Sequence, residues 1–232
     1  MARSYQNRIL SSLPGAEIAR LADHLSAVTL HQEQVLLDSD RKSQYAYFVE
    51  AGLASIVSTM NDGKSVEVGV VGKDGMIGLP ALLGTDSMPN RTFIQIPGSG
   101  YRIKASELKT EFERAGKLHN KLHRYVQAFL VQAAQTAACN RLHEISERLA
   151  RWLLMCQDRT DSDQLEITHK SLADMLGAPR PTVTLAAGIL QKAGAVRYSR
   201  GKVSILNRKR LEDASCECYA TIHKECRRLG LL

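Results

Sequence analysis

The chain has 232 residues, of which 31 are basic and 24 acidic, so its net charge at pH 7 is +7. That length is enough for two domains, each with a core of its own. No apolar run is long enough to span a bilayer, the amino terminus lacks the apolar segment of a secretory signal, and five cysteines do not form an even disulfide framework. We therefore expect a cytoplasmic protein with reduced thiols and no membrane partner.

The pattern of apolar residues changes along the amino-terminal half of the chain. Residues 1–27 have the apolar spacing of helices, whereas residues 28–103 read as short strands separated by turns. The strand candidates are residues 35–37, 45–49, 54–57, 66–71, 92–96 and 101–103. Asn61-Asp62-Gly63 predicts a hairpin, because that turn type requires positive φ at its centre. Such regular spacing predicts a small antiparallel barrel or sandwich.

A long helix is predicted over residues 115–138, and it has two apolar stripes. One stripe consists of Leu122, Tyr125, Phe129, Gln132 and Thr136, and its neighbour of Val126, Leu130, Ala133 and Ala137. Two faces imply two packing partners, so we expect one face to cover the barrel and the other to pair with a second copy of the chain. The alternative is a helix buried once, inside a monomer.

The helical pattern is interrupted after the long helix and then resumes. Asn140 and Arg141 predict a break, and residues 144–156 predict a further helix.

Residues 167–196 have the pattern of two short helices joined by a tight turn. Thr168 can cap the first helix with its hydroxyl, and Gly177 can adopt the turn conformation at little cost. The second helix is expected to start at residues 179–181, since proline is tolerated in a first turn. Val183, Ala187 and Leu190 give it a buried stripe. This is the spacing of a DNA-binding helix-turn-helix.

A basic hairpin follows the helix pair. Residues 196–205 read as two short strands around Arg200-Gly201, which makes the whole segment a winged helix whose wing can lie against phosphates. A helical hairpin packed on a structural β-hairpin is the alternative. The charge distribution favours DNA, because 16 of the 31 basic residues but only 11 of the 24 acidic ones lie from Cys139 onward.

The order of these parts resembles the Crp/Fnr family of transcription regulators, over nearly the whole chain. The resemblance rests on YFVEAG at 47–52, Asp62-Gly63, GKDGMIG at 72–78, Arg91-Thr92, SERLA at 146–150, the helix-turn-helix, RGKVSI at 200–205 and RKRL at 208–211. It implies an α+β fold with a jelly-roll-like antiparallel β-roll (1–114), a dimerisation helix (115–139) and a winged helix-turn-helix domain (140–232). It also implies a homodimer on a palindromic operator in double-stranded DNA, and contact with RNA polymerase.

The resemblance assigns DNA contacts residue by residue. Arg180 matches the family's guanine-contacting arginine, and Thr182 matches a threonine that contacts the DNA backbone. Pro181 and Leu185 replace the family's usual glutamate and second arginine, so Thr184 and Leu185 are expected to touch thymine methyl groups instead. The expected DNA-binding set is Thr168, Arg180, Thr182, Thr184, Leu185, Arg200 and Lys202.

The expected effector pocket departs from the family pattern. Cyclic-nucleotide-binding members carry a Gly-Glu pair whose glutamate binds the ribose and an Arg-Ser or Arg-Thr pair that binds the phosphate. Here Gly78 is followed by Leu79, while Arg91-Thr92 matches the second pair. The resemblance thus implies Gly78, Arg91 and Thr92 as a site for a small anion other than cyclic AMP. A solvated Arg91 with no ligand is the alternative.

No metal, cofactor or catalytic group is expected. No cysteine precedes Cys139, so the family's amino-terminal iron–sulfur ligands are missing, and an exposed pair explains His119 and His123 better than haem ligation does. Three thiols, Cys216, Cys218 and Cys226, with His223 are chemically able to bind zinc or respond to oxidation, but buried small residues are the preferred interpretation.

The sequence has no P-loop, Gly-x-Ser-x-Gly or His-Glu-x-x-His motif. Two alternatives to a DNA-binding regulator stay open. One is a ligand-binding module that docks a protein, and the other is a redox-responsive regulator acting through the carboxyl-terminal cysteines.

Overall fold

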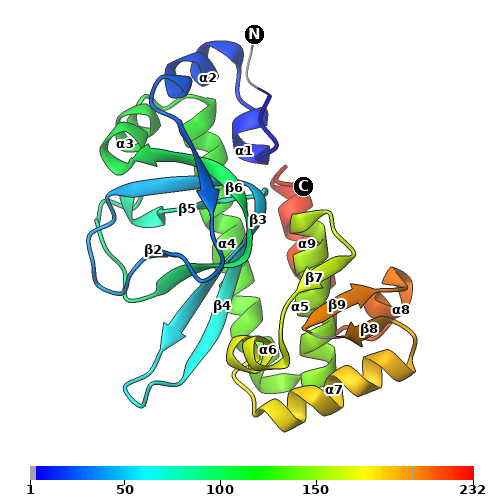
Figure 1. The fold of residues 1–232 in the computed structure, drawn as a ribbon. Coiled ribbons are helices and arrows are strands. Elements are labelled where there is room, and N and C mark those ends of the chain that lie inside the picture. Colours follow the sequence, from blue (N-terminus) through cyan, green and yellow to red (C-terminus); the bar gives the residue numbers. More distant parts are fainter. Residues whose placement is uncertain (1–3, 200) are drawn as a thin grey trace.

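The computed structural model describes residues 4–199 and 201–232 and shows a β-roll joined to a helical domain by one long helix (Figure 1). The roll is preceded by α1 (Arg8–Ser11) and α2 (Gly15–Ala22). Its strands are β1 (Ser26–Leu30), β2 (Val35–Leu37), β3 (Tyr45–Thr59), β4 (Ser65–Val71), β5 (Met76–Ile77) and β6 (Arg91–Lys104). All pairings are antiparallel, in the order β1-β6-β3-β4, with β2 on β6 and β5 on β3. The antiparallel roll predicted from the sequence is confirmed.

Two long bent strands replace four of the predicted short ones. Residues 45–49 and 54–57 both belong to β3, and residues 92–96 and 101–103 both belong to β6. The bend comes from a close approach of glycines: a Cβ on Gly98 would lie 2.0 Å from the Ala51 carbonyl oxygen, and Gly52 has φ +89°. The register shifts at this point. Glycine here marks a bulge where two backbones meet, not a turn between separate strands.

Three short elements of the roll were not predicted. Residues 26–30 form β1 where the helical pattern was extended to residue 27, β5 follows the tight turn at Gly75, and α3 (Ala105–Glu113) follows β6 directly. A 3-10 turn, η1 (Leu79–Ala81), begins after Gly78. The hairpin at residues 61–63 is confirmed, since it joins β3 to β4 and Gly63 has φ +82°.

The long helix α4 runs from Lys117 to Leu142, so the predicted break at Asn140 and Arg141 is wrong. The chain leaves the helix at His143, which is extended, and Glu144 then forms a capping box with Glu147 at the start of α5. Asn140 and Arg141 remain in α4 because the cap that starts α5, Glu144, comes only three residues later.

One stripe of α4 covers the roll, as expected. Leu122, Tyr125 and Gln132 are buried, and the Phe129 ring lies against Gly69 of β4. Thr136, at the end of this stripe, is buried too, but its hydroxyl accepts a hydrogen bond from Arg151 of the helical domain. His119 and His123 pack their rings against Phe112.

The carboxyl-terminal domain contains a helix-turn-helix and a small sheet. Its elements are α5 (Ile145–Thr160), β7 (Gln164–Glu166), α6 (His169–Leu176), α7 (Arg180–Lys192), β8 (Val196–Ser199), β9 (Lys202–Ile205), α8 (Arg208–Asp213) and α9 (Glu217–Arg228). The three-stranded sheet has the order β7-β9-β8. The predicted hairpin is confirmed, and β7 adds a strand that was not predicted. Helix α9 returns along α4, which brings the end of the chain back beside the roll (Figure 1).

Buried polar contacts hold the roll against this domain. Glu67 of β4 accepts hydrogen bonds from the Ser55 hydroxyl (2.6 Å) and from the Trp152 indole N–H of α5 (2.7 Å). Arg159 of α5 pairs with Asp74 at 2.9 Å, and both side chains are only 8% exposed. Burial raises the pKa of Glu67 to about 7, because desolvation of the carboxylate outweighs these hydrogen bonds and the nearby arginines.

The turn between α6 and α7 also touches the roll. A Cβ on Gly177 would lie 3.0 Å from the Cγ2 of Val66 on β4. The roll therefore contacts the helix-turn-helix at its turn, leaving α7 at the lower edge of the molecule (Figure 1). No helix in the described part of the chain is both long and apolar enough to cross a bilayer.

Candidate nucleic-acid interface

Local chemistry builds the helix-turn-helix as predicted. The Thr168 hydroxyl accepts the Ser171 N–H at 3.1 Å and caps α6. Gly177 ends that helix in the left-handed region with φ +58°, and the Ala178 N–H reaches back to the Ala173 carbonyl. Pro179 then precedes α7, whose first turn contains Pro181.

Helix α7 has one buried and one exposed face. Val183, Ala187 and Leu190 are fully buried, which confirms the predicted stripe. The opposite face carries Arg180, Pro181, Thr182, Thr184 and Leu185, all exposed. Leu185 is 71% exposed and Ile189 one turn later is 57% exposed. A guanidinium can pair with the edge of a guanine, and exposed apolar groups can contact thymine methyls. This face of α7 therefore has the chemistry that reads bases in a major groove.

His169 connects three parts of this surface. Its Nδ1 lies 3.1 Å from the Thr184 hydroxyl, which itself donates to the Arg180 carbonyl at 3.0 Å. Its ring meets the Tyr198 ring of β8 edge-on, with centroids 4.7 Å apart. Partial burial, and then the charge of Arg180, lower the pKa of His169, so the ring is neutral near pH 7 and its Nδ1–H can donate to Thr184.

The wing lies beside the first helix-turn-helix helix. Gly201 has φ +79°, and a Cβ there would lie 3.6 Å from the Thr168 methyl group. The backbone N–H of Tyr198 donates to Gln191 Oε1 at 2.9 Å, which ties the wing to α7. Lys202 is exposed and pairs with Glu166 of β7 at 2.7 Å, and this contact holds the pKa of Glu166 below its ordinary value. Arg200 lies outside the described residues.

The structure thus brings most of the predicted DNA-binding residues to one surface. Thr168, Thr184 and Lys202 surround the junction of α6, α7 and the wing, and Arg180 opens α7 beside them. Sequence reasoning missed His169, Glu166 and Ile189. A histidine that directly follows the predicted cap was the one available signal, because the first turn of α6 must lie near the amino-terminal half of α7.

The predicted effector residues of the roll lie in different surroundings. Gly78 has φ +109° and adjoins Ala46 of β3. Arg91 is exposed, with its guanidinium 5.8 Å from the centre of the Phe93 ring, whereas the Thr92 hydroxyl is buried and has no hydrogen-bond partner among the described residues. The two neighbouring side chains thus differ in exposure, and their role in an anion site stays a prediction.

A cavity of about 520 Å³ near this end of the roll has a different lining. It is lined by Lys42, Ser43, Ala81, Gly84, Thr85, Asp86, Ala105, Ser106 and Lys109.

Two family models match the chain in the order of its parts. The cyclic nucleotide-binding domain matches residues 27–114, and the Crp-like helix-turn-helix domain matches residues 147–214. Together they cover more than half of the chain and coincide with the roll and the DNA-binding domain. The chain belongs to the Crp/Fnr family. As a Crp/Fnr-type protein it is a DNA-binding regulator.

Relatives of known description agree with this assignment. Over 175 residues the chain is 24% identical to transcriptional regulator SdrP of Thermus thermophilus, a match that covers 72% of this chain and 82% of the relative. The fold is similar to that of FixK2 from Bradyrhizobium japonicum, with a TM-score of 0.71, 19% identity, and coverage of 83% of this chain and 98% of that one. It is also similar to the c-di-GMP responsive global regulator CLP of Xanthomonas campestris, with a TM-score of 0.64, 16% identity, and coverage of 84% and 100%.

Proposed function

We propose that this Crp/Fnr regulator binds a palindromic operator as a homodimer, with α7 of each subunit in a major groove. The exposed face of α7 carries the proposal: Arg180, Thr184 and Leu185 project from a helix whose other face is fixed in the core by Val183, Ala187 and Leu190. Half-sites about 10 bp apart, or a multiple of that, fit a two-fold dimer.

Base reading and backbone contact fall to different residues in this proposal. The Arg180 fork meets a guanine edge, and the methyl groups of Thr184, Leu185 and Ile189 meet thymine methyls. Thr182 at the start of α7, Thr168 at the cap of α6, and Arg200 and Lys202 of the wing meet phosphates. With Pro181 and Leu185 in place of two polar base-contacting residues, we expect an operator that differs from the best-known family site.

The dimer is proposed to form through the second stripe of α4. Leu130 is 58% exposed in the single chain, and Val126 and Ala133 beside it are only partly buried. Small side chains at Ala133, Ala134 and Ala137 allow two helices to approach closely. The stripe that covers the roll is the neighbouring one on the same helix, and Leu130 points away from it, so both sets of contacts form at once.

The effector is proposed to be a small anion other than cyclic AMP, or to be absent. Leu79 is buried and apolar where a ribose-binding carboxylate is needed, and Arg91 is exposed whereas the neighbouring Thr92 is buried. One protein of similar fold is a c-di-GMP responsive regulator, so this fold does not imply cyclic AMP. We also propose that the regulator contacts RNA polymerase and that it acts in the cytoplasm.

Selection of bound duplexes from a random DNA pool, with and without cell extract, tests the function. We expect a two-fold symmetric consensus with a guanine in each half-site. Sedimentation of the protein with one selected duplex should give two chains per operator. Failure to retain any duplex would favour the protein-docking alternative, and retention without a consensus would contradict base reading by α7.

A further inference from the structure

Three cysteines and a histidine from distant parts of the chain meet at the carboxyl-terminal end of α4. Cys139 and His143 lie one helical turn apart there, and Cys216 and Cys218 flank the start of α9. The ligand atoms of these four side chains all lie within 4.8 Å of one another. The three thiols are buried, and His143 lies at the edge of the cluster with 18% of its side chain exposed.

The distances suit one metal ion at the centre of the cluster. Cys139 Sγ lies 3.5 Å from Cys216 Sγ, and Cys218 Sγ lies 3.5 Å from His143 Nδ1. Thiolates about 2.3 Å from a zinc ion at tetrahedral angles lie about 3.8 Å from one another. The four side chains therefore need only small movements to coordinate zinc.

The groups around the cluster are those that orient metal ligands. His143 turns Nδ1 toward Cys218, and its Nε2 lies 3.3 Å from the Glu217 carboxylate. A carboxylate at the far nitrogen of a ligating histidine fixes its tautomer and raises its basicity. The Gln135 amide donates to Cys218 Sγ at 3.1 Å, and the cationic Arg148 interacts electrostatically with Cys139 and Cys216. An amide donor and a buried guanidinium both stabilise thiolates.

We propose that Cys139, His143, Cys216 and Cys218 bind one Zn²⁺ per chain in a closed tetrahedral site. Three thiolates and an imidazole form a ligand set that zinc favours, and four protein ligands leave no position for a substrate, so the site is structural. On binding, each thiol that coordinates the metal releases its proton, and no electron is transferred.

The sequence suggested a different ligand set, in which Cys226 and His223 accompany Cys216 and Cys218. Cys226 lines a small cavity with Asp74 and Arg159 beneath α4, and His223 packs beside Tyr219. The missing ligands come from α4, some 75 residues earlier in the chain. A short Cys-x-Cys spacing is sufficient once a helix supplies the other half of the site.

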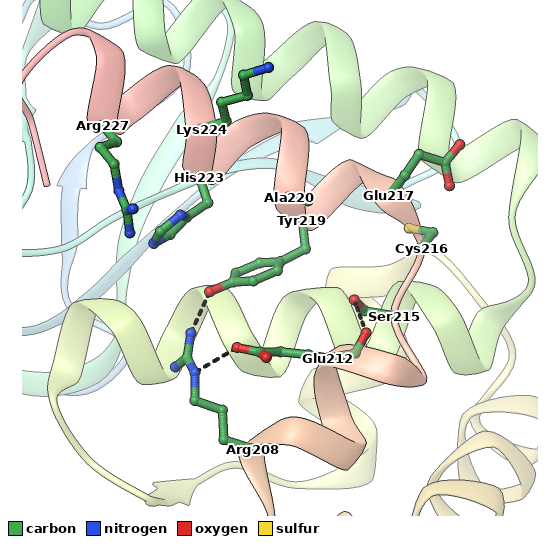
Figure 2. A pocket seen from close by; sticks show the side chains of 10 residues that line it. All are labelled: Arg208, Glu212, Ser215, Cys216, Glu217, Tyr219, Ala220, His223, Lys224 and Arg227. Atoms are coloured by element: carbon green, nitrogen blue, oxygen red, sulfur yellow. Dashed lines mark hydrogen bonds and ion pairs between the residues drawn. The ribbon is translucent and has the colours of Figure 1, made fainter.

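The site has a defined mechanical position in the fold. Figure 2 shows Cys216 and Glu217 together where α9 begins, at one end of an open pocket of about 600 Å³ that extends to Arg227. His143 is the residue at which α4 ends, directly before the cap of α5. Zinc bound here fastens the start of α9 to the junction between the long helix and the DNA-binding domain.

Cobalt substitution and metal analysis of the full-length protein test the proposal. We expect about one zinc per chain after purification under reducing conditions without chelator. After zinc removal and reduction, Co²⁺ titration should give thiolate-to-cobalt charge-transfer bands and intense d–d bands typical of tetrahedral coordination, and Zn²⁺ should abolish them and raise the Tm. A reduced wild-type protein that gives no such spectrum, or octahedral bands only, would overturn the proposal.

Matched cysteine variants locate the metal. Cys218→Ser and Cys139→Ser should lose the tetrahedral spectrum and the zinc-dependent rise in Tm. Cys226→Ser and Cys156→Ser replace buried thiols outside the cluster and should keep both. Because a ligand variant can also fail to fold, circular dichroism is recorded for each variant. A folded Cys139→Ser, Cys218→Ser double variant that still takes up one zinc would refute the assignment. A Cys139–Cys216 disulfide that forms in air equally well with saturating zinc would refute it too.

Discussion

Arg180 and Lys202 represent two kinds of DNA contact that single substitutions can separate. Arg180→Ala should cost about 1–3 kcal/mol of operator binding and relax the preference at one guanine per half-site. Lys202→Ala should weaken all sequences alike and reduce the salt slope by about one. Fluorescence anisotropy on the selected operator and its guanine variants, at several salt concentrations, measures both. Unchanged relative preferences in Arg180→Ala would contradict its role in reading a base.

The ion pair between Lys202 and Glu166 supplies the matched variant for this test. Glu166 holds the Lys202 ammonium at 2.7 Å in the free protein, so Lys202 must leave this carboxylate to reach a phosphate. Glu166→Gln should therefore tighten binding to every duplex and leave sequence preference unchanged. Lys109→Ala removes an exposed lysine of α3, at the opposite end of the molecule from α7 (Figure 1), and should change neither quantity.

Leu79 decides the effector question at the level of one side chain. An apolar group where a ribose hydroxyl would be buried leaves that hydroxyl without a partner, at about 1–3 kcal/mol. Affinity for cyclic AMP should fall roughly 5- to 150-fold below that of a site with the carboxylate. Calorimetric titration with cyclic AMP and cyclic GMP is expected to show no tight binding. A dissociation constant near micromolar, together with a matching gain in operator affinity, would contradict this.

Helix α4 is the element on which the dimer depends, and its two stripes make opposite predictions. Leu130→Glu places charges where two copies of the helix are proposed to meet, and it should convert the dimer to a monomer in sedimentation velocity runs. Operator binding should weaken with it, because each half-site alone supplies half the contacts. Met60→Glu, a similarly exposed apolar position on the β3–β4 hairpin, is the control and should stay dimeric.

Phe129→Glu tests a different contact of the same helix. The Phe129 ring packs on Gly69 of the roll, so a charge there should lower stability and not primarily the oligomeric state. A Leu130→Glu protein that sediments as a dimer would contradict the proposed interface.

Some elements could be predicted from the sequence and others could not. The difference lies in how far apart in sequence the residues are whose contacts form each element. Thr168, Gly177 and Val183 act within one or two turns of helix, so capping and periodicity were sufficient to predict the helix-turn-helix. The bends at Gly52 and Gly98 depend on two strands meeting each other, and sequence could not distinguish such a bend from a turn.

The candidate sites follow the same rule. The outward residues of α7 followed from one helical period, whereas the His169 bridge needed the packing of α6, α7 and the wing. Cys139 and Cys216 meet only because α9 folds back along α4. Contacts between residues so far apart in sequence are set by the fold as a whole and leave no local pattern.

For the whole molecule, the contact between roll and DNA-binding domain titrates near neutral pH. The pKa of Glu67 is raised to about 7 from an ordinary value of about 4.5, so the folded protein binds an extra proton between these values. The stabilisation from that proton is fully present below about pH 4.5 and is lost as pH rises through about 7. Its upper limit is about 3 kcal/mol, since one pKa unit corresponds to about 1.36 kcal/mol.

Glu67→Gln should remove this pH dependence. A glutamine can still accept the Trp152 N–H and can donate to the Ser55 oxygen, so the contact across the domains remains without a charge to bury. The variant should be more stable than the wild type at pH 8, and the difference between the two should shrink as pH falls from 7 to 4.5. Urea unfolding at a series of pH values measures the free energy of unfolding of both proteins. Subtracting one curve from the other cancels the contribution of histidine titration, which the two proteins share. Glu113→Gln, an exposed surface position, should leave the curve unchanged. A variant less stable than the wild type at pH 8 would show that Glu67 is needed in its ionised form.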